Sequence, residues 1–390
     1  MRWWVKLVVL LLAANVAVVS GTARTRQPAL PASTPTDDEI RSILVKRIDV
    51  EKQSVGIVAG VIDAKRRRIV SHGRLEQDEV RPLGGDTVFE IGSVTKVFSA
   101  LLLTDMAQKG ELALTDPISK YLPDGTTVPQ RGGQAITLQD LAMHTSGLPR
   151  MPNNFAPADP LNPYADYGFD RLTQFLSGYT LTRDVGAQYE YSNLGGGLLG
   201  TLLARRAGLD YEALVTQRIS KPLAMTSTAV TLTATMKARL ATGHNARLEP
   251  TPNWDFPPAT STLTGAGGLR STANDLLNFV AAALGLTKSP LGRDFEGLLA
   301  TRRPTGRPNL EIALGWHVTT RPAGKQTVWH NGGTGGYRSF VGYDSSAGIG
   351  VVVLSNAFTP AGVDDIGMHL LDATVPLWAL PVPQVPKGID

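Results

Sequence analysis

Apolar runs divide the chain into a strand-rich beginning, a helical middle and a strand-rich end. Residues 37–49 carry apolar side chains at helical spacing, whereas residues 55–62 and 68–73 are short apolar runs typical of paired strands. Near the other end, short connections favour antiparallel neighbours among residues 313–318, 327–330, 339–343 and 349–354. The pattern predicts an α/β (α+β) fold, in which an antiparallel sheet is flanked by helices and a mainly helical lobe is inserted over roughly residues 93–264.

The middle of the chain contains a strongly apolar helix, a long loop and a glycine-rich segment. The helix follows Ser93, where apolar residues recur at helical spacing. Residues 151–169 are rich in Pro, Asn and Asp and have no period, so we expect a loop that rims the functional site. Residues 191–200 lead into a helix that ends at Gly208, and their glycines would let this helix approach another closely.

Composition narrows the possible classes of protein. With 390 residues, of which 42% are hydrophobic and 18% charged, the chain can bury a large core. The formal net charge is only +4, and Arg2 and Lys6 contribute two of these charges, so nothing indicates a nucleic-acid partner. The absence of cysteine excludes disulfides, a cysteine nucleophile and thiolate metal sites.

The N-terminus has the pattern of a secretory signal peptide. Residues 1–23 contain two early cations, an apolar run and then small residues. The proline-containing residues 24–36 are expected to be a linker, followed by one domain over residues 37–380 and a tail over residues 381–390. The mature protein is therefore predicted to be periplasmic or secreted. An uncleaved membrane anchor is the alternative, although the apolar run is short for a membrane span.

Ser93 and Lys96 stand three residues apart where the apolar helix starts. On a helix this spacing puts two side chains on one face, about 5–6 Å apart at Cβ, so the Lys96 amine can reach the Ser93 hydroxyl. An amine can take the serine proton, or hold down the pKa of a third group that does so. The N–H of Ser93 can also stabilise an oxyanion. The structural alternative is a capping serine and a solvated lysine.

Two further patterns supply partners for this pair. Tyr191 has Asn193 two residues later, and His330 has Gly332 two residues later. A neighbouring cation would lower the pKa of Tyr191 and allow it to act as a phenolate base, while Asn193 could hold a substrate amide or orient the lysine. Gly332 and Gly333 would let a substrate backbone lie along their strand, with the Gly333 N–H as a second oxyanion donor. Each residue also has a purely structural alternative. Tyr191 could be a half-buried core residue, Asn193 a helix cap, and Gly332 with Gly333 a tight hairpin.

In their order and separation, these three patterns resemble the serine β-lactamase and penicillin-binding protein family, specifically its class C-like branch, which includes D,D-peptidases and related esterases. The resemblance extends to residues 144–149, 222–225, 267–272 and 330–356, so it covers roughly residues 40–371. It implies a β-lactamase/D,D-peptidase-like fold and a reaction that passes through an acyl-enzyme.

The resemblance also implies roles for individual residues. Ser93 would be the nucleophile, Lys96 and Tyr191 the proton-transfer partners, and Asn193 a substrate contact. The N–H groups of Ser93 and Gly333 would form the oxyanion hole. His330, Gly332 and Gly333 would line the substrate-binding site.

The third pattern departs from the Lys-Thr-Gly that β-lactamases of this branch usually carry. His330 stands at the lysine position and Asn331 at the threonine position. Histidine at that place also occurs in peptidase and esterase relatives, so the departure weakens the β-lactamase interpretation but not the serine-hydrolase one. Two hypotheses follow for His330. It could attract a substrate carboxylate when charged, below its ordinary pKa of about 6.5, or stay neutral within the proton network.

The leading hypothesis is an exported serine hydrolase that opens β-lactam amides. A D,D-peptidase acting on peptidoglycan and a carboxylesterase are the alternatives. An α/β-hydrolase is disfavoured because no serine has glycine at both −2 and +2, and a zinc hydrolase because the chain lacks His-Glu-x-x-His and cysteine. A non-catalytic penicillin sensor or wall-binding module would keep Ser93 but need no efficient activation of water, so the intact Lys96 and Tyr191 argue against it. We expect a monomer with a small-molecule substrate (a β-lactam, a D-Ala-D-Ala-type peptide or an acyl ester) and with no cofactor, metal or nucleic-acid partner.

Overall fold

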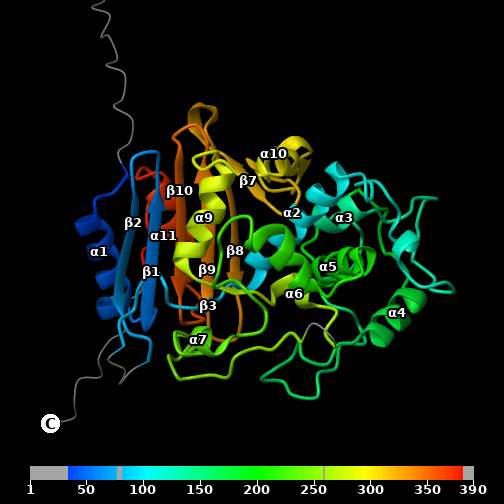
Figure 1. Ribbon diagram of the computed structural model, residues 1–390, viewed down its shortest axis with the longest axis horizontal. Coiled ribbons are helices and arrows are strands. Elements are labelled where there is room, and N and C mark those ends of the chain that lie inside the picture. Colours follow the sequence, from blue (N-terminus) through cyan, green and yellow to red (C-terminus); the bar gives the residue numbers. More distant parts are fainter. Residues whose placement is uncertain (1–33, 77–80, 258–259, 381–390) are drawn as a thin grey trace, which may run out of the picture. The chain divides into compact units, whose positions relative to one another are not determined.

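The computed structural model describes residues 34–76, 81–257 and 260–380. The segment interpreted as a signal peptide, most of the expected linker and the C-terminal tail lie outside these residues. The described residues belong to a single unit that begins at Thr34, in which helices surround a central sheet (Figure 1).

The central sheet is antiparallel and joins both ends of the described chain, as the sequence predicts. Its order is β2-β1-β10-β9-β8-β7-β6-β5, so the first hairpin lies beside the last strand. One predicted strand is displaced, because residues 313–316 form a tight turn in which the Ala313 N–H donates to the Trp316 carbonyl. The strands are β1 (Gly56–Ile62), β2 (Arg67–Gly73), β5 (Arg303–Pro304), β6 (Leu310–Ile312), β7 (His317–Thr320), β8 (Gln326–Gly333), β9 (Arg338–Asp344) and β10 (Ile349–Ser355).

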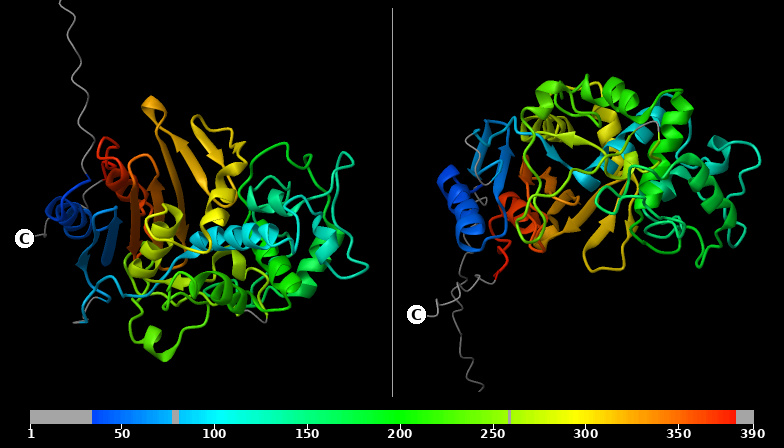
Figure 2. Two further views of the ribbon diagram at one scale, coloured as in Figure 1. Left: turned by 45° about the horizontal axis from the view of Figure 1, so that its top comes forward. Right: turned by 90° about the horizontal axis from the view of Figure 1, so that it is seen from below.

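Both faces of the sheet are covered, which is why its inner strands are apolar throughout. Successive side chains on a strand point to opposite faces, and Ile57 belongs to one apolar cluster while Val58 belongs to the other. Helices α1 (Asp37–Val45) and α11 (Asp364–Leu371) cover the first face, and α9 (Ala273–Ala283) covers the second (Figure 2). A π-helical turn over Lys46–Val50 completes the helix that the sequence predicts over residues 37–49.

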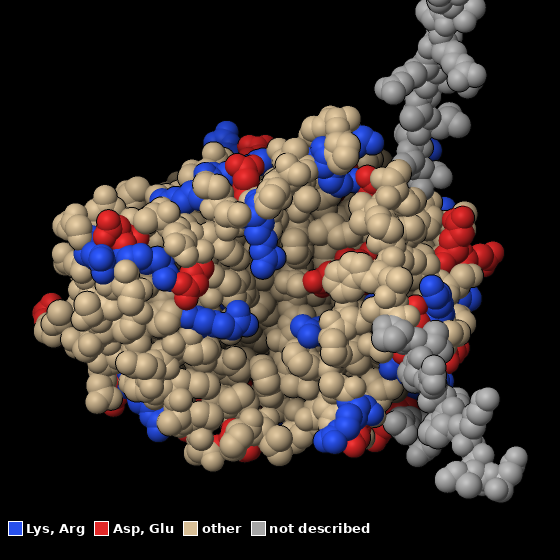
Figure 3. All heavy atoms as spheres, turned by 180° about the vertical axis from the view of Figure 1, so that it is seen from behind, with Lys and Arg blue, Asp and Glu red and all other residues tan. Residues whose placement is uncertain are grey.

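Charged side chains of both signs are interspersed on the face of the molecule shown in Figure 3. Lysine and arginine side chains stand at several points around a hollow in this face. In the part of the chain that the structure describes, no helix combines the length and the apolar character that crossing a bilayer requires.

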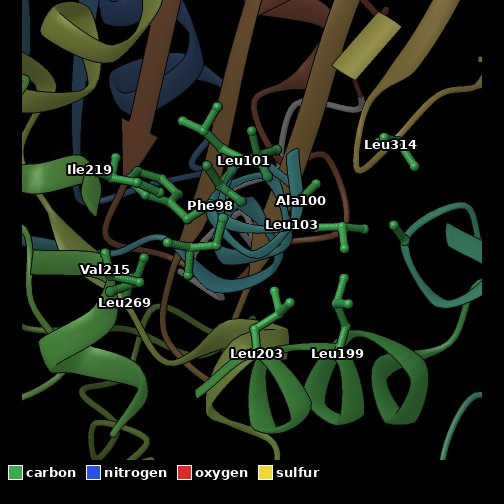
Figure 4. Close-up of a cluster of buried hydrophobic side chains, with 14 of the residues drawn as sticks. Phe98, Ala100, Leu101, Leu103, Leu199, Leu203, Val215, Ile219, Leu269 and Leu314 are labelled. Carbon is green, nitrogen blue, oxygen red and sulfur yellow. The ribbon is translucent and has the colours of Figure 1, made fainter. Parts of the chain in front are cut away.

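Helix α2 (Thr95–Gln108) runs through the middle of the larger apolar cluster. Every residue from Thr95 to Met106 is buried, so the helix is surrounded rather than amphipathic. Figure 4 shows Phe98 and Leu101 of this helix among side chains from the surrounding helices, including Leu203. Because close packing on all sides fixes the helix axis, the residues at its N-terminal end have a rigid support.

The remaining helices form the inserted lobe and the connections to the sheet. Their bounds are α3 (Leu138–Ala142), α4 (Phe169–Gly178), α5 (Asn193–Ala207), α6 (Tyr211–Val215), α7 (Ala234–Lys237), α8 (Thr264–Gly267) and α10 (Gly292–Ala300). Shorter turns occur at Gly92–Val94, Ile118–Tyr121, Thr216–Ser220 and Pro322–Gly324, and a small second sheet pairs β3 (Phe89–Glu90) with β4 (Arg270–Ser271).

The glycines of α5 allow the close helix approach that the sequence predicts. A Cβ on Gly200 would lie 2.8 Å from the Cα of Gly265 in α8, and one on Gly197 would lie 2.7 Å from the carbonyl oxygen of Thr262. Both obstructing atoms are backbone, so they cannot rotate away. The two helices therefore depend on the absence of side chains at this contact.

We predict that Gly200→Ala destabilises the protein by about 1–3 kcal/mol, the usual cost of overpacking a close contact. Gly292→Ala is the matched control, because no atom lies within 4 Å of a Cβ at that helical position. It is expected to be neutral or slightly stabilising. Urea unfolding of both variants measures the difference, and a Gly200→Ala protein as stable as the control would contradict the role given to this contact.

Candidate active site

Ser93 lies in the turn Gly92–Val94, between β3 and the buried helix α2. The backbone of Gly92 has φ +49°, and a Cβ there would lie 2.7 Å from the backbone nitrogen of Gly333. Only glycine meets both demands. A Cβ on Gly332 would likewise lie 3.0 Å from the Ser93 nitrogen. The structure thus brings the backbone nitrogens of Ser93 and Gly333 together, where the sequence predicts an oxyanion hole.

The Lys96 side chain reaches Ser93 as its spacing predicts. Its Nζ lies 3.1 Å from Ser93 Oγ, 2.9 Å from Asn193 Oδ1 and 2.7 Å from the carbonyl oxygen of Ala266. The side chain is buried along α5, where a Cβ on Gly196 would lie 2.8 Å from Lys96 Cε. Burial, followed by the charge of Arg150, lowers the pKa of Lys96 well below its usual range.

The partners of Lys96 suit a neutral amine. The oxygens of Asn193 and Ala266 can only accept hydrogen bonds, so they take two N–H groups of the amine. The remaining direction faces Ser93 Oγ, to which the protonated amine donates. The lowered pKa favours the neutral amine, which has two N–H groups for the carbonyl oxygens and one lone pair that can accept the serine proton.

Tyr191 lies beside the same pair, but its ionisation differs from the prediction. Its ring centroid is 4.9 Å from Lys96 Nζ. Burial raises the pKa of Tyr191, and a hydrogen bond with Ser93 opposes this shift only in part. The phenolate expected from the sequence required a neighbouring ammonium, and the lowered pKa of Lys96 removes that cation. In the resting protein Tyr191 is therefore a protonated phenol.

His144 holds Tyr191 in place, a role that the sequence did not reveal. The N–H of Ser192, the residue after Tyr191, donates to His144 Nδ1 at 3.1 Å. The centroids of the two rings are 4.5 Å apart, and the rings are tilted by an interplanar angle of 34°. Burial lowers the pKa of His144 well below its usual range, so Nδ1 remains an acceptor. This contact could be found only once the two segments were placed side by side.

The same turn also fixes Asn193. The Asn193 N–H donates to the carbonyl of Arg150 at 3.0 Å, and the Ser192 hydroxyl donates to the carbonyl of Pro149 at 2.7 Å. Hydrogen bonds to residues 144–150 thus hold the backbone around Tyr191 in place. Ser192 is the helix cap here, accepting from the N–H of Gly195 at 2.8 Å, so the asparagine side chain is left for Lys96.

The burial of His330 bears on the two hypotheses for its role and favours the neutral imidazole. Its side chain is fully buried between Tyr191 and His317, with ring centroids at 6.3 and 5.3 Å. Burial lowers the pKa of His330 well below its usual range, because the charged form would lose its hydration. A charged imidazole that attracts a substrate carboxylate is at odds with this position. The neighbouring Asn331 also points elsewhere, donating to Asp364 at 2.5 Å.

The strand that carries Gly332 and Gly333 has a free edge at this point. Strand β7 pairs with β8 only as far as Trp329, whereas β9 continues to Gly333. Among the described residues, no strand pairs with residues 330–333 on the β7 side. An extended substrate backbone can therefore add to β8 beside Ser93.

Aromatic side chains line the pocket around Ser93. Tyr164 comes from the loop over residues 151–169, which confirms that this loop rims the site. Its ring lies 5.0 Å from that of Trp254 and 4.9 Å from that of Phe256. Trp254 and Phe256 were not predicted from the sequence. They occupy an irregular segment far along the chain, which the buried carboxylate of Glu90 anchors by accepting from the Trp254 N–H at 3.0 Å.

Three buried histidines stand near Tyr191, but not as a metal centre. His144, His317 and His330 are linked through ring contacts, and the Tyr189 hydroxyl lies 3.1 Å from His317 Nε2. Within the residues that the structure describes, no group of three His, Cys, Asp or Glu side chains is arranged to hold a metal ion.

The fold and these contacts place a serine and a lysine side by side at the start of a buried helix. A model of the β-lactamase family matches residues 41–374, and the chain belongs to that family. Among curated proteins, the Escherichia coli K12 D-alanyl-D-alanine-carboxypeptidase/endopeptidase AmpH is 32% identical over 252 residues, 63% of this chain and 62% of that protein, so this chain spans less than two thirds of its length. A β-lactamase of Pseudomonas fluorescens is 26% identical over 360 residues, 83% of this chain and 95% of that protein.

Solved structures agree with the fold. The β-lactamase/D-alanine carboxypeptidase of Yersinia pestis complexed with citrate superimposes with a TM-score of 0.73 at 26% identity, covering 87% of this chain and 97% of that one. The D-alanine carboxypeptidase AmpC of Burkholderia cenocepacia gives a TM-score of 0.72 at 25% identity, covering 87% of this chain and all of that one. The sequence family and the fold therefore agree on membership of the β-lactamase family.

We predict that His144→Ala lowers kcat on the order of 10²-fold with little change in KM, because Tyr191 loses the contact that orients it. His144→Asn is the matched rescue, since its Oδ1 can accept from the Ser192 N–H and asparagine tolerates the positive φ of 56° at this position. Steady-state kinetics with melting temperatures test this. If the asparagine variant loses as much kcat as the alanine variant while both stay folded, the acceptor has no such role.

Proposed function

We propose that this protein is an exported hydrolase that forms an acyl-enzyme at Ser93 and opens the amide bond of β-lactams. The observation that carries the proposal is the position of the Lys96 amine, 3.1 Å from Ser93 Oγ with its other hydrogen-bonding directions taken by carbonyl oxygens. A buried amine with a lowered pKa is a base that can activate a serine near neutral pH.

The reaction follows from the protonation states. Ser93 Oγ transfers its proton to Lys96 and bonds to the amide carbon, and the resulting oxyanion accepts hydrogen bonds from the N–H groups of Ser93 and Gly333. As the C–N bond breaks, the Tyr191 hydroxyl gives its proton to the leaving nitrogen, and Lys96 returns a proton to Tyr191. Water then attacks the ester carbon, and its proton moves back along the same path to Ser93.

A second candidate substrate is a peptide that ends in D-alanyl-D-alanine. Two observations favour it: the free edge of β8 at residues 330–333, which fits an extended backbone, and the likeness to a D-alanyl-D-alanine carboxypeptidase/endopeptidase. Both substrates form the same acyl-enzyme, so the rate of deacylation decides between them. A neutral acyl ester is the third substrate class to compare.

The proposed location is outside the cytoplasm. The support is the sequence pattern of residues 1–23, with early cations, an apolar run and small residues. Both the β-lactam and the peptidoglycan substrate would be met there.

We predict that a slowly hydrolysed β-lactam leaves one covalent adduct, on the peptide that contains Ser93, and that Ser93→Ala abolishes it. Intact-protein and peptide mass spectrometry measure this. Tyr191→Phe is expected to slow acylation roughly 10²–10⁴-fold, as for loss of a general acid. An adduct that persists in Ser93→Ala would refute the assignment of the nucleophile.

We also predict the sign of the pH dependence. Only the unprotonated Lys96 amine can accept the serine proton, so kcat/KM for a neutral acyl ester should rise with pH and level off above the pKa of Lys96. Because burial lowers that pKa, the midpoint should lie below the ordinary value of about 10.4. In Lys96→Arg, which stays protonated, this limb should vanish along with most of the activity. A native profile that falls across the same range would contradict Lys96 as the base.

A further inference from the structure

The pattern His330-Asn331-Gly332 puts no permanent cation on β8 beside the site. His330 is buried and neutral, and the Asn331 side chain is turned toward Asp364 on α11. β-Lactams and peptide C-termini both carry a carboxylate, and its recognition generally calls for a cation or several N–H donors. If this enzyme selects anionic substrates, the charge must come from another element.

Arg150 stands where such a charge is needed. Its guanidinium carbon lies 5.2 Å from the ring centroid of Tyr191, and Lys96 Nζ lies 4.9 Å from the same centroid. Its backbone is held in place, because its carbonyl accepts from the N–H of Asn193 at 3.0 Å. The side chain itself is exposed. A fixed backbone with an exposed cation beside the reacting groups is a suitable anchor for an anion from solution.

Arg150 has no carboxylate partner among the residues that the structure describes. Arg183 pairs with Glu190 and Arg303 pairs with Asp140, whereas no carboxylate of the described residues lies within 4 Å of the Arg150 guanidinium. Its charge still reaches the site, since it contributes to lowering the pKa of Lys96. The guanidinium is therefore an exposed positive charge beside Tyr191, without a paired carboxylate among the described residues.

The chemistry of the substrates matches this position. Penicillins, cephalosporins and peptides ending in D-alanine share one feature. The carbon that carries the carboxylate is bonded directly to the amide nitrogen that leaves. Tyr191 is the group placed to protonate that nitrogen. A cation against the Tyr191 ring is accordingly beside the carboxylate of each of these substrates, and arginine can bind a carboxylate through two parallel N–H groups.

We propose that Arg150 is the specificity-determining residue that binds the substrate carboxylate in this enzyme, in place of a lysine on β8. The inference rests on the proposed acyl-enzyme function and extends it, because it names the substrate class as anionic amides. Arg150, which directly follows residues 144–149, would then bind the substrate carboxylate, which His330 and Asn331 do not do here.

The test compares the second-order rate constant of acylation for two substrates, an anionic chromogenic cephalosporin and the uncharged ester p-nitrophenyl butyrate. In Arg150→Gln the cephalosporin should react roughly 10- to 100-fold more slowly, through a higher KM, as for loss of a charge-assisted hydrogen bond. The ester should change by less than about threefold. Arg150→Lys should lie between the native and Gln variants, because it keeps the charge but not the paired N–H groups.

Arg41→Gln is the matched control, since it removes one exposed arginine from α1, beside β2 at the far edge of the sheet from β8. It should leave both rate constants unchanged. Added salt should reduce the native preference for the anion and have little effect in Arg150→Gln. An equal loss for both substrates in Arg150→Gln would overturn the proposal and make Arg150 a positioning residue for Tyr191. Unchanged rates for both would overturn it as well.

Failure of the proposed function gives a different result. In that case the native protein itself would form no adduct at Ser93 with either substrate. If the native protein is acylated at Ser93 but Arg150→Gln keeps the same preference for the anionic substrate, only the role of Arg150 is rejected. The proposed acyl-enzyme function then stands.

Discussion

Burial of one amine is the constraint on which the rest of the structure depends. A buried amino group is costly unless its polar partners are supplied, and Lys96 obtains them from Ser93, from Asn193 and from the carbonyl of Ala266. These partners belong to the turn before α2, to α5 and to the short helix α8. The three elements must therefore meet at one point, and the glycines of α5 permit it, because Gly196 leaves room for the lysine chain itself. The same packing that builds the core of the helical lobe also sets the basicity of the amine.

The site keeps its reacting groups neutral and its charge at the surface. Burial disfavours the charged form of Lys96, Tyr191, His144 and His330 alike, so the resting centre contains hydrogen-bond donors and acceptors rather than ions. Such a centre leaves the Lys96 amine free to take the serine proton, whereas a fixed internal ion pair would keep that amine protonated. Arg150, an exposed cation, contacts the face of the Tyr191 ring.

The sequence predicts those features that depend on local spacing. The i, i+3 relation of Ser93 and Lys96 survives in the turn and helix that the chain forms, and the apolar runs give the order of strands at both ends. Features that depend on burial or on distant segments do not follow from spacing. The ionisation of Tyr191 has the opposite direction to the prediction because the sequence does not show how deeply the phenol is enclosed. The residues 313–316 look like a strand because they are apolar, but they are buried in a turn.

The pairing of β1 with β10 has a consequence for how the protein folds. β1 lies near the start of the domain, and its partner β10 is followed by only one more helix. Contacts so far apart in the chain carry a high loop-closure entropy and form late. While the chain is being synthesised, α1 can cover one face of the β1–β2 hairpin, but the other face waits for α9 and the free edge of β1 waits for β10. A chain of this kind remains unfolded, and open to chaperones, for most of its synthesis.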